Sequence, residues 1–177
     1  MIRLNPDQGA FSFQIVSMSF RIGFGVDFHR LAEGRKLILG GVHIPFEKGA
    51  LGHSDADVLL HAICDAMLGA LNLGDIGVHF PDTDPAFKNI DSKILLQRVF
   101  ELIKKNNYRV VNIDSSICLE EPRIRRFTDE MRGIIASTLN MQQTDVSIKA
   151  TTTEGMGFVG RGEGLIAYAT LLLEKVN

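Results

Sequence analysis

Apolar residues recur along the chain at spacings that predict both strands and helices. The segment FRIGFGVDF, which begins at Phe20, alternates apolar residues with small or polar ones and predicts a strand. An apolar run at 37–44 follows a turn-like AEGR and is expected to be the hairpin or sheet partner of that strand. Residues 54–73 carry apolar side chains at helical spacing, which predicts a helix with Ser54 or Asp55 as its N-cap.

The later part of the chain continues this alternation after an irregular stretch. The stretch GDIGVHFPDTDPAFKN is too long and too rich in Gly, Pro and Asp for a simple connection, so a functional loop is expected there. The pattern then predicts a helix, a strand, a helix that begins near proline, and two strands that flank a glycine-rich turn, at 91–106, 108–119, 122–140, 145–151 and 165–173. The outcome is one α+β domain with a small mixed sheet backed by helices.

Composition narrows the class of protein. The 177 residues are 45% hydrophobic and 23% charged, with a formal charge of -2, which is typical of a globular protein and argues against a nucleic-acid binder. Cys64 and Cys118 lie among apolar residues, so buried thiols in a reducing compartment are expected. No apolar run approaches the roughly 20 residues of a membrane helix, and a cytoplasmic location is expected. Residues 1–17 lack a sustained period and are assigned to an extension before a domain at 18–177.

Candidate chemistry gathers first around a set of acidic and histidine residues. Asp27 and His29 are two residues apart on a strand, so their side chains point to the same face and are able to share one ion. His61 on the following helix is a plausible third zinc ligand, and Asp57 and Asp65 lie four residues to either side of it. Taken singly, these residues are better explained as solvated aspartates and partly buried histidines, and only their combination favours a metal site. The sequence His53-Ser54-Asp55 before the helix adds donors for a phosphate group.

Two further motifs are rich in polar groups. In KATTTEGMGFVGRGEG, threonine hydroxyls, Glu154 and Arg161 are suited to a diphosphate, although a tight hairpin with a solvated Glu and Arg explains the motif equally well. In GDIGVHFPDTDP the aspartates either accept hydroxyls from a ligand or cap turns, and capping is the default next to proline. A Walker phosphate-binding motif is absent.

Five blocks in order resemble the 2-C-methyl-D-erythritol 2,4-cyclodiphosphate synthase family: GFGVDFHR, LGGVHIPFEKG, GHSDADVLLHA, LGDIGVHFPDTDP and ATTTEGMGFVGRGEG. The resemblance implies a ferredoxin-like or chorismate-mutase-like subunit in a homotrimer with active sites between subunits. It implies conversion of 4-diphosphocytidyl-2-C-methyl-D-erythritol 2-phosphate to the 2,4-cyclodiphosphate and CMP in the non-mevalonate isoprenoid pathway. Alternatives are a zinc-dependent nucleotide-diphosphate hydrolase and a non-catalytic isoprenoid-diphosphate binding protein.

The resemblance also implies residue roles. Zinc is expected at Asp27, His29 and His61, a second ion, Mg²⁺ or Mn²⁺, at Glu154, and transition-state stabilisation by His53 and Thr152. The substrate is expected to contact the zinc-site residues Asp27 and His29, and the polar or loop residues His53, Ser54, Asp65, Asp75, Ile76, Gly77, Phe80, Pro81, Asp82, Thr83 and Asp84. A cytosine pocket is expected from Leu119, Pro122, Arg123, Ile124, Arg125, Ala150, Thr151, Thr152 and Thr153. Phe158 and Arg161 are expected near the threefold axis, where an isoprenoid diphosphate is a candidate ligand.

Overall fold

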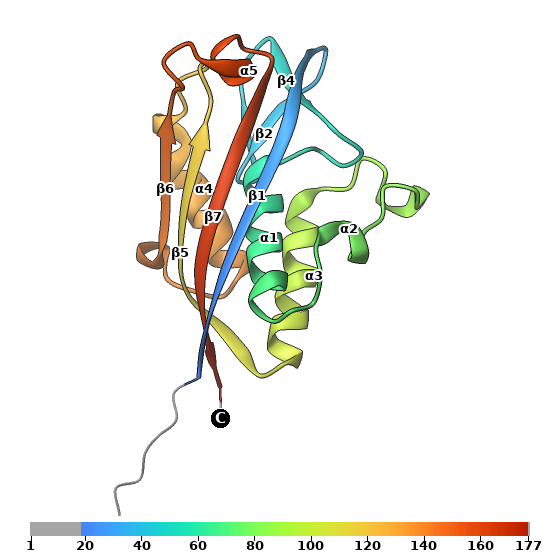
Figure 1. Cartoon of the computed structure of the whole chain (residues 1–177), viewed down its shortest axis with the longest axis vertical. Coiled ribbons are helices and arrows are strands. Elements are labelled where there is room, and N and C mark those ends of the chain that lie inside the picture. Colours follow the sequence, from blue (N-terminus) through green and yellow to red (C-terminus); the bar gives the residue numbers. More distant parts are fainter. Residues whose placement is uncertain (1–18, 177) are drawn as a thin grey trace, which may run out of the picture.

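A five-stranded mixed sheet organises the computed structural model, which describes residues 19–176. Its strand order is β4-β1-β7-β5-β6, and among the described strands only β5 and β6 pair in parallel. The strands are β1 (Phe20–Glu33), β4 (Lys48–Leu51), β5 (Tyr108–Cys118), β6 (Val146–Thr151) and β7 (Gly164–Lys175). Figure 1 shows the long strands β1 and β7 side by side at the centre of the sheet.

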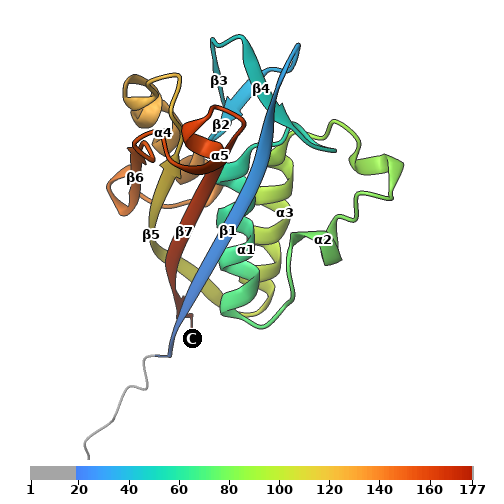
Figure 2. The same ribbon diagram turned by 45° about the horizontal axis from the view of Figure 1, so that its top comes forward.

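Three helices cover one face of this sheet, as the two ribbon views show (Figures 1 and 2). They are α1 (Val58–Ala70), α3 (Ser92–Lys105) and α4 (Thr128–Thr138). The core lies between these helices and the sheet, and α1 is almost wholly buried. The predicted single α+β domain with a mixed sheet backed by helices is therefore confirmed. The proposed extension at 1–17 lies outside the described residues.

Two glycines on β1 let helix α1 lie directly against the strand. A Cβ atom added at Gly23 would lie 1.8 Å from the carbonyl oxygen of Ala66, and one added at Gly25 would lie 2.0 Å from that of Ala62. Neither position tolerates a side chain, since backbone atoms are unable to move aside as a flexible side chain does. Because alternate residues of a strand share a face, these glycines point the same way as Asp27 and bring α1 close to it.

The structure corrects the expected partner of β1. The run at 37–44 divides at Gly40 and Gly41, both with positive φ, into β2 (Leu37–Leu39) and β3 (Val42–Ile44). These two strands pair with each other as a separate sheet, and β1 pairs instead with β4 and β7. The positive φ angles favour glycine and allow the tight reversal that makes this hairpin.

Two helices begin later than the sequence predicts. Helix α1 is capped by Asp57, not by Ser54 or Asp55, because Ala56 has a positive φ of 58° that no helical residue adopts. The expected helix at 122–140 becomes a 3₁₀ turn, Arg125–Phe127, followed by α4 from Thr128. Before that turn, the Glu120 carboxylate accepts hydrogen bonds from the amide and hydroxyl of Thr153, which lies in the loop after β6.

The glycine-rich motif is not a hairpin. Strand β6 pairs with β5, whereas β7 lies between β1 and β5, so β6 and β7 are not neighbours. The connection between them contains the short helix α5 (Gly157–Gly160). Residues 74–89, which were expected to form a functional loop, contain another short helix, α2 (Ile76–His79), and a 3₁₀ turn, Pro85–Phe87. A last 3₁₀ turn, Gln143–Asp145, precedes β6.

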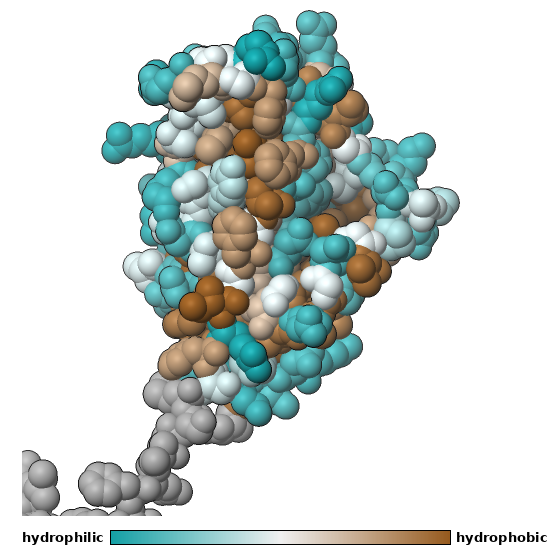
Figure 3. All heavy atoms as spheres, viewed as in Figure 1, coloured by the Kyte–Doolittle hydropathy of each residue, from teal (hydrophilic) through white to brown (hydrophobic). Residues whose placement is uncertain are grey.

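The sheet face opposite the helices is open and apolar. Figure 3 shows apolar side chains gathered along this face, which Figure 1 views in the same orientation. Ile22 and Phe24 of β1 are 73% and 62% exposed.

Cys64 is buried as expected, whereas Cys118 is only partly buried, near the end of β5. Among the described helices, none has the length and apolar character needed to cross a membrane.

Candidate metal centre and neighbouring cavities

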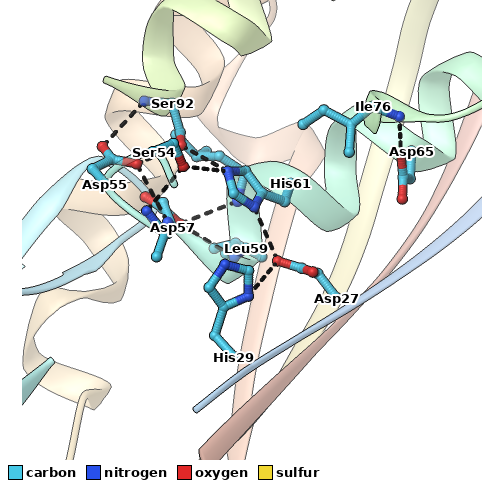
Figure 4. Close-up of polar contacts among 12 residues, drawn as sticks. Asp27, His29, Ser54, Asp55, Asp57, Leu59, His61, Asp65, Ile76 and Ser92 are labelled. Atoms are coloured by element: carbon cyan, nitrogen blue, oxygen red, sulfur yellow. Dashed lines mark hydrogen bonds and ion pairs between the residues drawn. The ribbon is translucent and has the colours of Figure 1, made fainter. Parts of the chain in front are cut away.

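Asp27, His29 and His61 converge where β1 meets α1 (Figure 4). Asp27 and His29 come from one face of the strand, and His61 comes from the helix that the β1 glycines bring close. The carboxylate oxygen Oδ2 of Asp27 lies 3.1 Å from Nδ1 of His29 and 3.0 Å from Nδ1 of His61. One ligand atom from each residue lies within 4.8 Å of the others. The predicted three-residue cluster is therefore present.

The donor set suits a divalent cation. Nδ1 of His29 is buried and has no hydrogen-bond partner of good geometry among the described residues, although the Asp27 carboxylate is near it. An unpartnered buried nitrogen is unfavourable unless something binds it. Two imidazoles and one carboxylate are a common ligand set of catalytic zinc sites, in which a fourth position stays open. The three residues thus fit a metal ion.

The charges of the cluster favour the ionised carboxylate. Burial alone would raise the pKa of Asp27, but the neighbouring side chains of His29 and His61 outweigh it and lower that pKa to about 2. Burial likewise opposes a charge on His61, and the Asp27 carboxylate reverses this and raises the pKa of the imidazole. A carboxylate that stays ionised is the form that binds a cation.

The ring of His61 is held from its other side by two serines. Nε2 of His61 lies 3.1 Å from the Ser54 hydroxyl and 2.9 Å from that of Ser92. Ser92 is fully buried at the start of α3 and was not among the residues that the sequence pointed to. Its only sequence signal is its place beside the N-cap Asp91, which says nothing about a contact with a distant helix.

The two aspartates that flank His61 do not form an acidic face with it. Asp57 is fully buried, and its carboxylate accepts hydrogen bonds from the amides of Gly40, Gly41, Leu59 and Leu60. Burial raises the pKa of Asp57 to about 6, although these amides favour the ionised form. Asp65 accepts a 2.7 Å hydrogen bond from the amide of Ile76, and burial raises its pKa. Asp57 therefore caps the helix and anchors the β2–β3 hairpin, and Asp65 anchors α2.

A cavity of about 450 Å³ opens beside the metal cluster. It contains most of the residues expected around the substrate's phosphate and sugar parts. Its walls are formed by Asp27, His29, His53, Ser54, His61, Ile76, Gly77, Phe80, Pro81, Asp82, Phe87, Ile90 and Leu95. The ring nitrogen Nε2 of His53 lies 3.4 Å from the carbonyl oxygen of Asp84.

Four other predicted contacts do not line this cavity: Asp65, Asp75, Thr83 and Asp84. Asp75 and Asp84 cap the short helical turns that follow them, which is the alternative that the sequence left open.

A second cavity, of about 370 Å³, contains most of the residues expected around the cytosine. Its lining is Leu119, Glu120, Pro122, Arg123, Ile124, Arg125, Ala150, Thr151 and Thr152. The Thr152 hydroxyl donates a 2.8 Å hydrogen bond to the carboxylate of Glu154. Glu120 lies in the segment expected to line this pocket, although it was not among the named contacts. Its carboxylate accepts hydrogen bonds from the Thr153 amide and hydroxyl in the threonine loop (residues 151–154), and these bonds lower its pKa.

No residue lines both of these cavities. Within one chain, His53 and Thr152 therefore face different spaces. A third cavity, of about 510 Å³, has Phe158 and Arg161 in its walls together with Arg30, Lys48 and Glu163, and it touches His29. The fold brings together part of each predicted group, and the metal cavity and the third cavity share His29.

Together, the fold and the site define a mixed α+β protein with three side chains that could hold a metal ion in the wall of a ligand-sized cavity. The chain belongs to the YgbB family, whose family model matches residues 20–174. It is 58% identical over 156 residues to the 2-C-methyl-D-erythritol 2,4-cyclodiphosphate synthase of Chloroherpeton thalassium, covering 88% of this chain and 99% of that protein.

Two solved structures extend the likeness to three dimensions. The bifunctional IspDF of Campylobacter jejuni is 39% identical with a TM-score of 0.88, and the match covers 91% of this chain and 44% of that one. A CDP complex of IspF from Plasmodium falciparum is 34% identical with a TM-score of 0.78, covering 89% of this chain and 97% of that one.

Proposed function

We propose that this chain converts 4-diphosphocytidyl-2-C-methyl-D-erythritol 2-phosphate to 2-C-methyl-D-erythritol 2,4-cyclodiphosphate and CMP, as a lyase of the non-mevalonate isoprenoid pathway. The observation that carries this function is the convergence of Asp27, His29 and His61 beside a cavity, in a chain 58% identical to a synthase of that name. The hydrolase alternative is not favoured by any of these relatives.

The residues present suit an intramolecular phosphoryl transfer. A phosphate monoester is largely dianionic near pH 7, because its second pKa is about 6, so the 2-phosphate needs no serine, cysteine or strong base to activate it. What slows the reaction is the approach of two anionic groups, and a bound divalent cation neutralises that charge. The chain contributes by holding the flexible substrate bent inside the cavity. Less conformational entropy then has to be lost when the reactive geometry forms.

We assign zinc to Asp27, His29 and His61, and a second ion, Mg²⁺ or Mn²⁺, to Glu154. Two imidazoles with a carboxylate are typical zinc ligands, whereas a lone exposed carboxylate shared with diphosphate oxygens suits a hard cation such as Mg²⁺. His53 lines the metal cavity and Thr152 the second cavity, so each places a hydrogen-bond donor toward a different part of the substrate. These donors are assigned to transition-state stabilisation.

The second cavity is assigned to the cytidine part of the substrate. The CDP complex of the Plasmodium falciparum relative supports a cytidine ligand. Arg123 and Arg125 in its walls supply positive charge suited to a diphosphate, and the backbone of the threonine loop offers further polar groups. Substrate contacts by Asp65, Asp75, Thr83, Asp84, Thr153 and Glu154 stay predictions.

We also infer a homotrimer of ferredoxin-like subunits whose active sites lie between neighbours. The separation of the His53 and Thr152 cavities within one chain supports this, because a partner subunit is then needed to bring them together. The open apolar sheet face supplies a surface to bury, since large exposed apolar patches mark interaction sites. In such a trimer Phe158 and Arg161 are assigned to the axis, with an isoprenoid diphosphate as candidate ligand.

The direct test incubates the full chain with the cytidine-linked 2-phosphate substrate, zinc and magnesium in ¹⁸O-labelled water. We expect stoichiometric CMP and a cyclic diphosphate free of ¹⁸O, and no product from chain stripped of metal with a chelator. Release of CMP with ¹⁸O in the remaining phosphate would establish the hydrolase instead. A metal-replete chain that releases no CMP would contradict both enzymatic functions.

A further inference from the structure

Behind His61, on the side away from Asp27, lies a pair formed by the buried Ser92 and the half-buried Asp55. The Ser92 hydroxyl donates a short hydrogen bond to Oδ1 of Asp55, and the Ser92 amide donates to Oδ2 of the same carboxylate at 3.1 Å. The amide of Asp55 in turn donates to the carbonyl of Ile90 at 3.1 Å. Neither Ser92 nor Asp55 lines the metal cavity. The pair is therefore placed to act on His61 and not on a ligand.

Toward His61, the Ser92 hydroxyl is able only to accept a hydrogen bond. A serine hydroxyl has one proton to donate and lone pairs to accept with. Because an ionised carboxylate only accepts, the Ser92 proton is committed to Asp55. The contact of 2.9 Å between the Ser92 oxygen and Nε2 of His61 then requires the proton to be on Nε2.

The second serine is compatible with the same arrangement. The Ser54 oxygen accepts a 3.0 Å hydrogen bond from the amide of Ala56 and lies 3.1 Å from Nε2 of His61. A neutral imidazole with its proton on Nε2 has its lone pair on Nδ1. That Nδ1 is the atom that faces Asp27 at 3.0 Å. A divalent cation bound between this Nδ1 and the Asp27 carboxylate would accept a lone pair from each of them.

We propose that Asp55 and Ser92 are positioning residues that hold His61 as the Nε2–H tautomer, with Nδ1 presented to the divalent cation. This inference rests on the proposed metal site at Asp27, His29 and His61. Outer hydrogen-bond partners of this kind orient a histidine ligand and increase its basicity, and their loss typically weakens metal binding by about 10 to 100-fold.

The test compares zinc affinity in Ser92→Ala and Ser115→Ala by competition with a chromogenic chelator at one pH. Ser115 is an equally matched control, since it is 2% exposed and its hydroxyl bonds the carbonyl of Ser147, away from the cluster. We expect zinc binding to weaken by about 10 to 100-fold in Ser92→Ala and to be unchanged in Ser115→Ala. The absorption spectrum of bound Co²⁺ should shift in the first variant only.

An unchanged zinc affinity and Co²⁺ spectrum in folded Ser92→Ala would overturn the inference. Should that variant not fold, ¹⁵N NMR of the zinc-loaded wild-type chain still decides it: Nε2 of His61 must carry the proton and Nδ1 the metal, and the opposite tautomer refutes the proposal. Failure of the wild-type chain to bind zinc at all would instead contradict the metal site of the proposed function, so the two failures are distinguishable.

Discussion

At the scale of single residues, the site depends on a few polar atoms whose partners are fixed by their surroundings. The Thr152 hydroxyl illustrates this, because it donates to the Glu154 carboxylate within the same loop. The same two groups are proposed to act on the diphosphate, Thr152 as a donor and Glu154 through a cation. Binding of substrate therefore has to replace a contact within the loop by contacts to phosphate oxygen.

We predict that Thr152→Ala lowers kcat by about 10 to 1000-fold, because a donor to the transition state is lost while the loop backbone remains. Steady-state kinetics with CMP detection measures this. Thr138→Ala is the matched control, since that hydroxyl bonds only a helix carbonyl, of Ile134, and its loss should leave kcat unchanged. Equal rates for Thr152→Ala and wild type would remove Thr152 from the mechanism.

At the scale of secondary-structure elements, the metal cluster exists because β1 and α1 approach more closely than side chains normally permit. Gly25 lies two residues before Asp27 on the same face, and the carbonyl that occupies its missing Cβ position belongs to Ala62, next to His61. The spacing between strand and helix is therefore coupled to the spacing between the ligands that each element carries.

We predict that Gly25→Ala lowers the free energy of unfolding by about 1 to 3 kcal/mol and weakens zinc binding, because α1 has to move away from β1. Urea denaturation and zinc analysis measure the two effects. Gly69→Ala on α1 is the control, since its Cβ would meet only the Phe24 carbonyl, at 4.0 Å. That variant should be as stable as wild type or up to about 1 kcal/mol more stable. A Gly25→Ala protein with full stability and full zinc content would refute the coupling.

At the scale of the whole molecule, His53 and Thr152 line two different cavities of the chain. The metal cavity and the threonine-loop cavity share no lining residue, while the sheet face opposite the helices is left open and apolar. A closed assembly that buries this face and brings the two kinds of cavity together accounts for both observations.

We predict that two impaired variants, His61→Ala and Thr152→Ala, are more active when they are unfolded together and refolded as mixed trimers than when each is refolded alone. With random assembly, about one quarter of the shared sites receive an intact His61 from one subunit and an intact Thr152 from its neighbour. Activity of the mixture is measured against each variant refolded alone. A mixture no more active than its parts would indicate that each site is built within one chain.

The sequence by itself determined the features that depend on local pattern. Alternation along β1 predicts the face shared by Asp27 and His29, and helical spacing over residues 54–73 predicts the helix that carries His61. The family blocks contain His53 and Thr152, which line the two cavities. These features follow from the periods of strand and helix, which can be recognised within a few consecutive residues of the sequence.

Only the tertiary structure decided how distant segments meet. Asp57 reads as a solvated or metal-facing residue until the β2–β3 hairpin places two amides on its carboxylate. Ser92 gains its role only because α3 begins beside His61, and β6 and β7 prove not to be neighbours because β5 lies next to both. Sequence period specifies which face a residue occupies, whereas the partner of that face is fixed by packing between elements far apart in the chain.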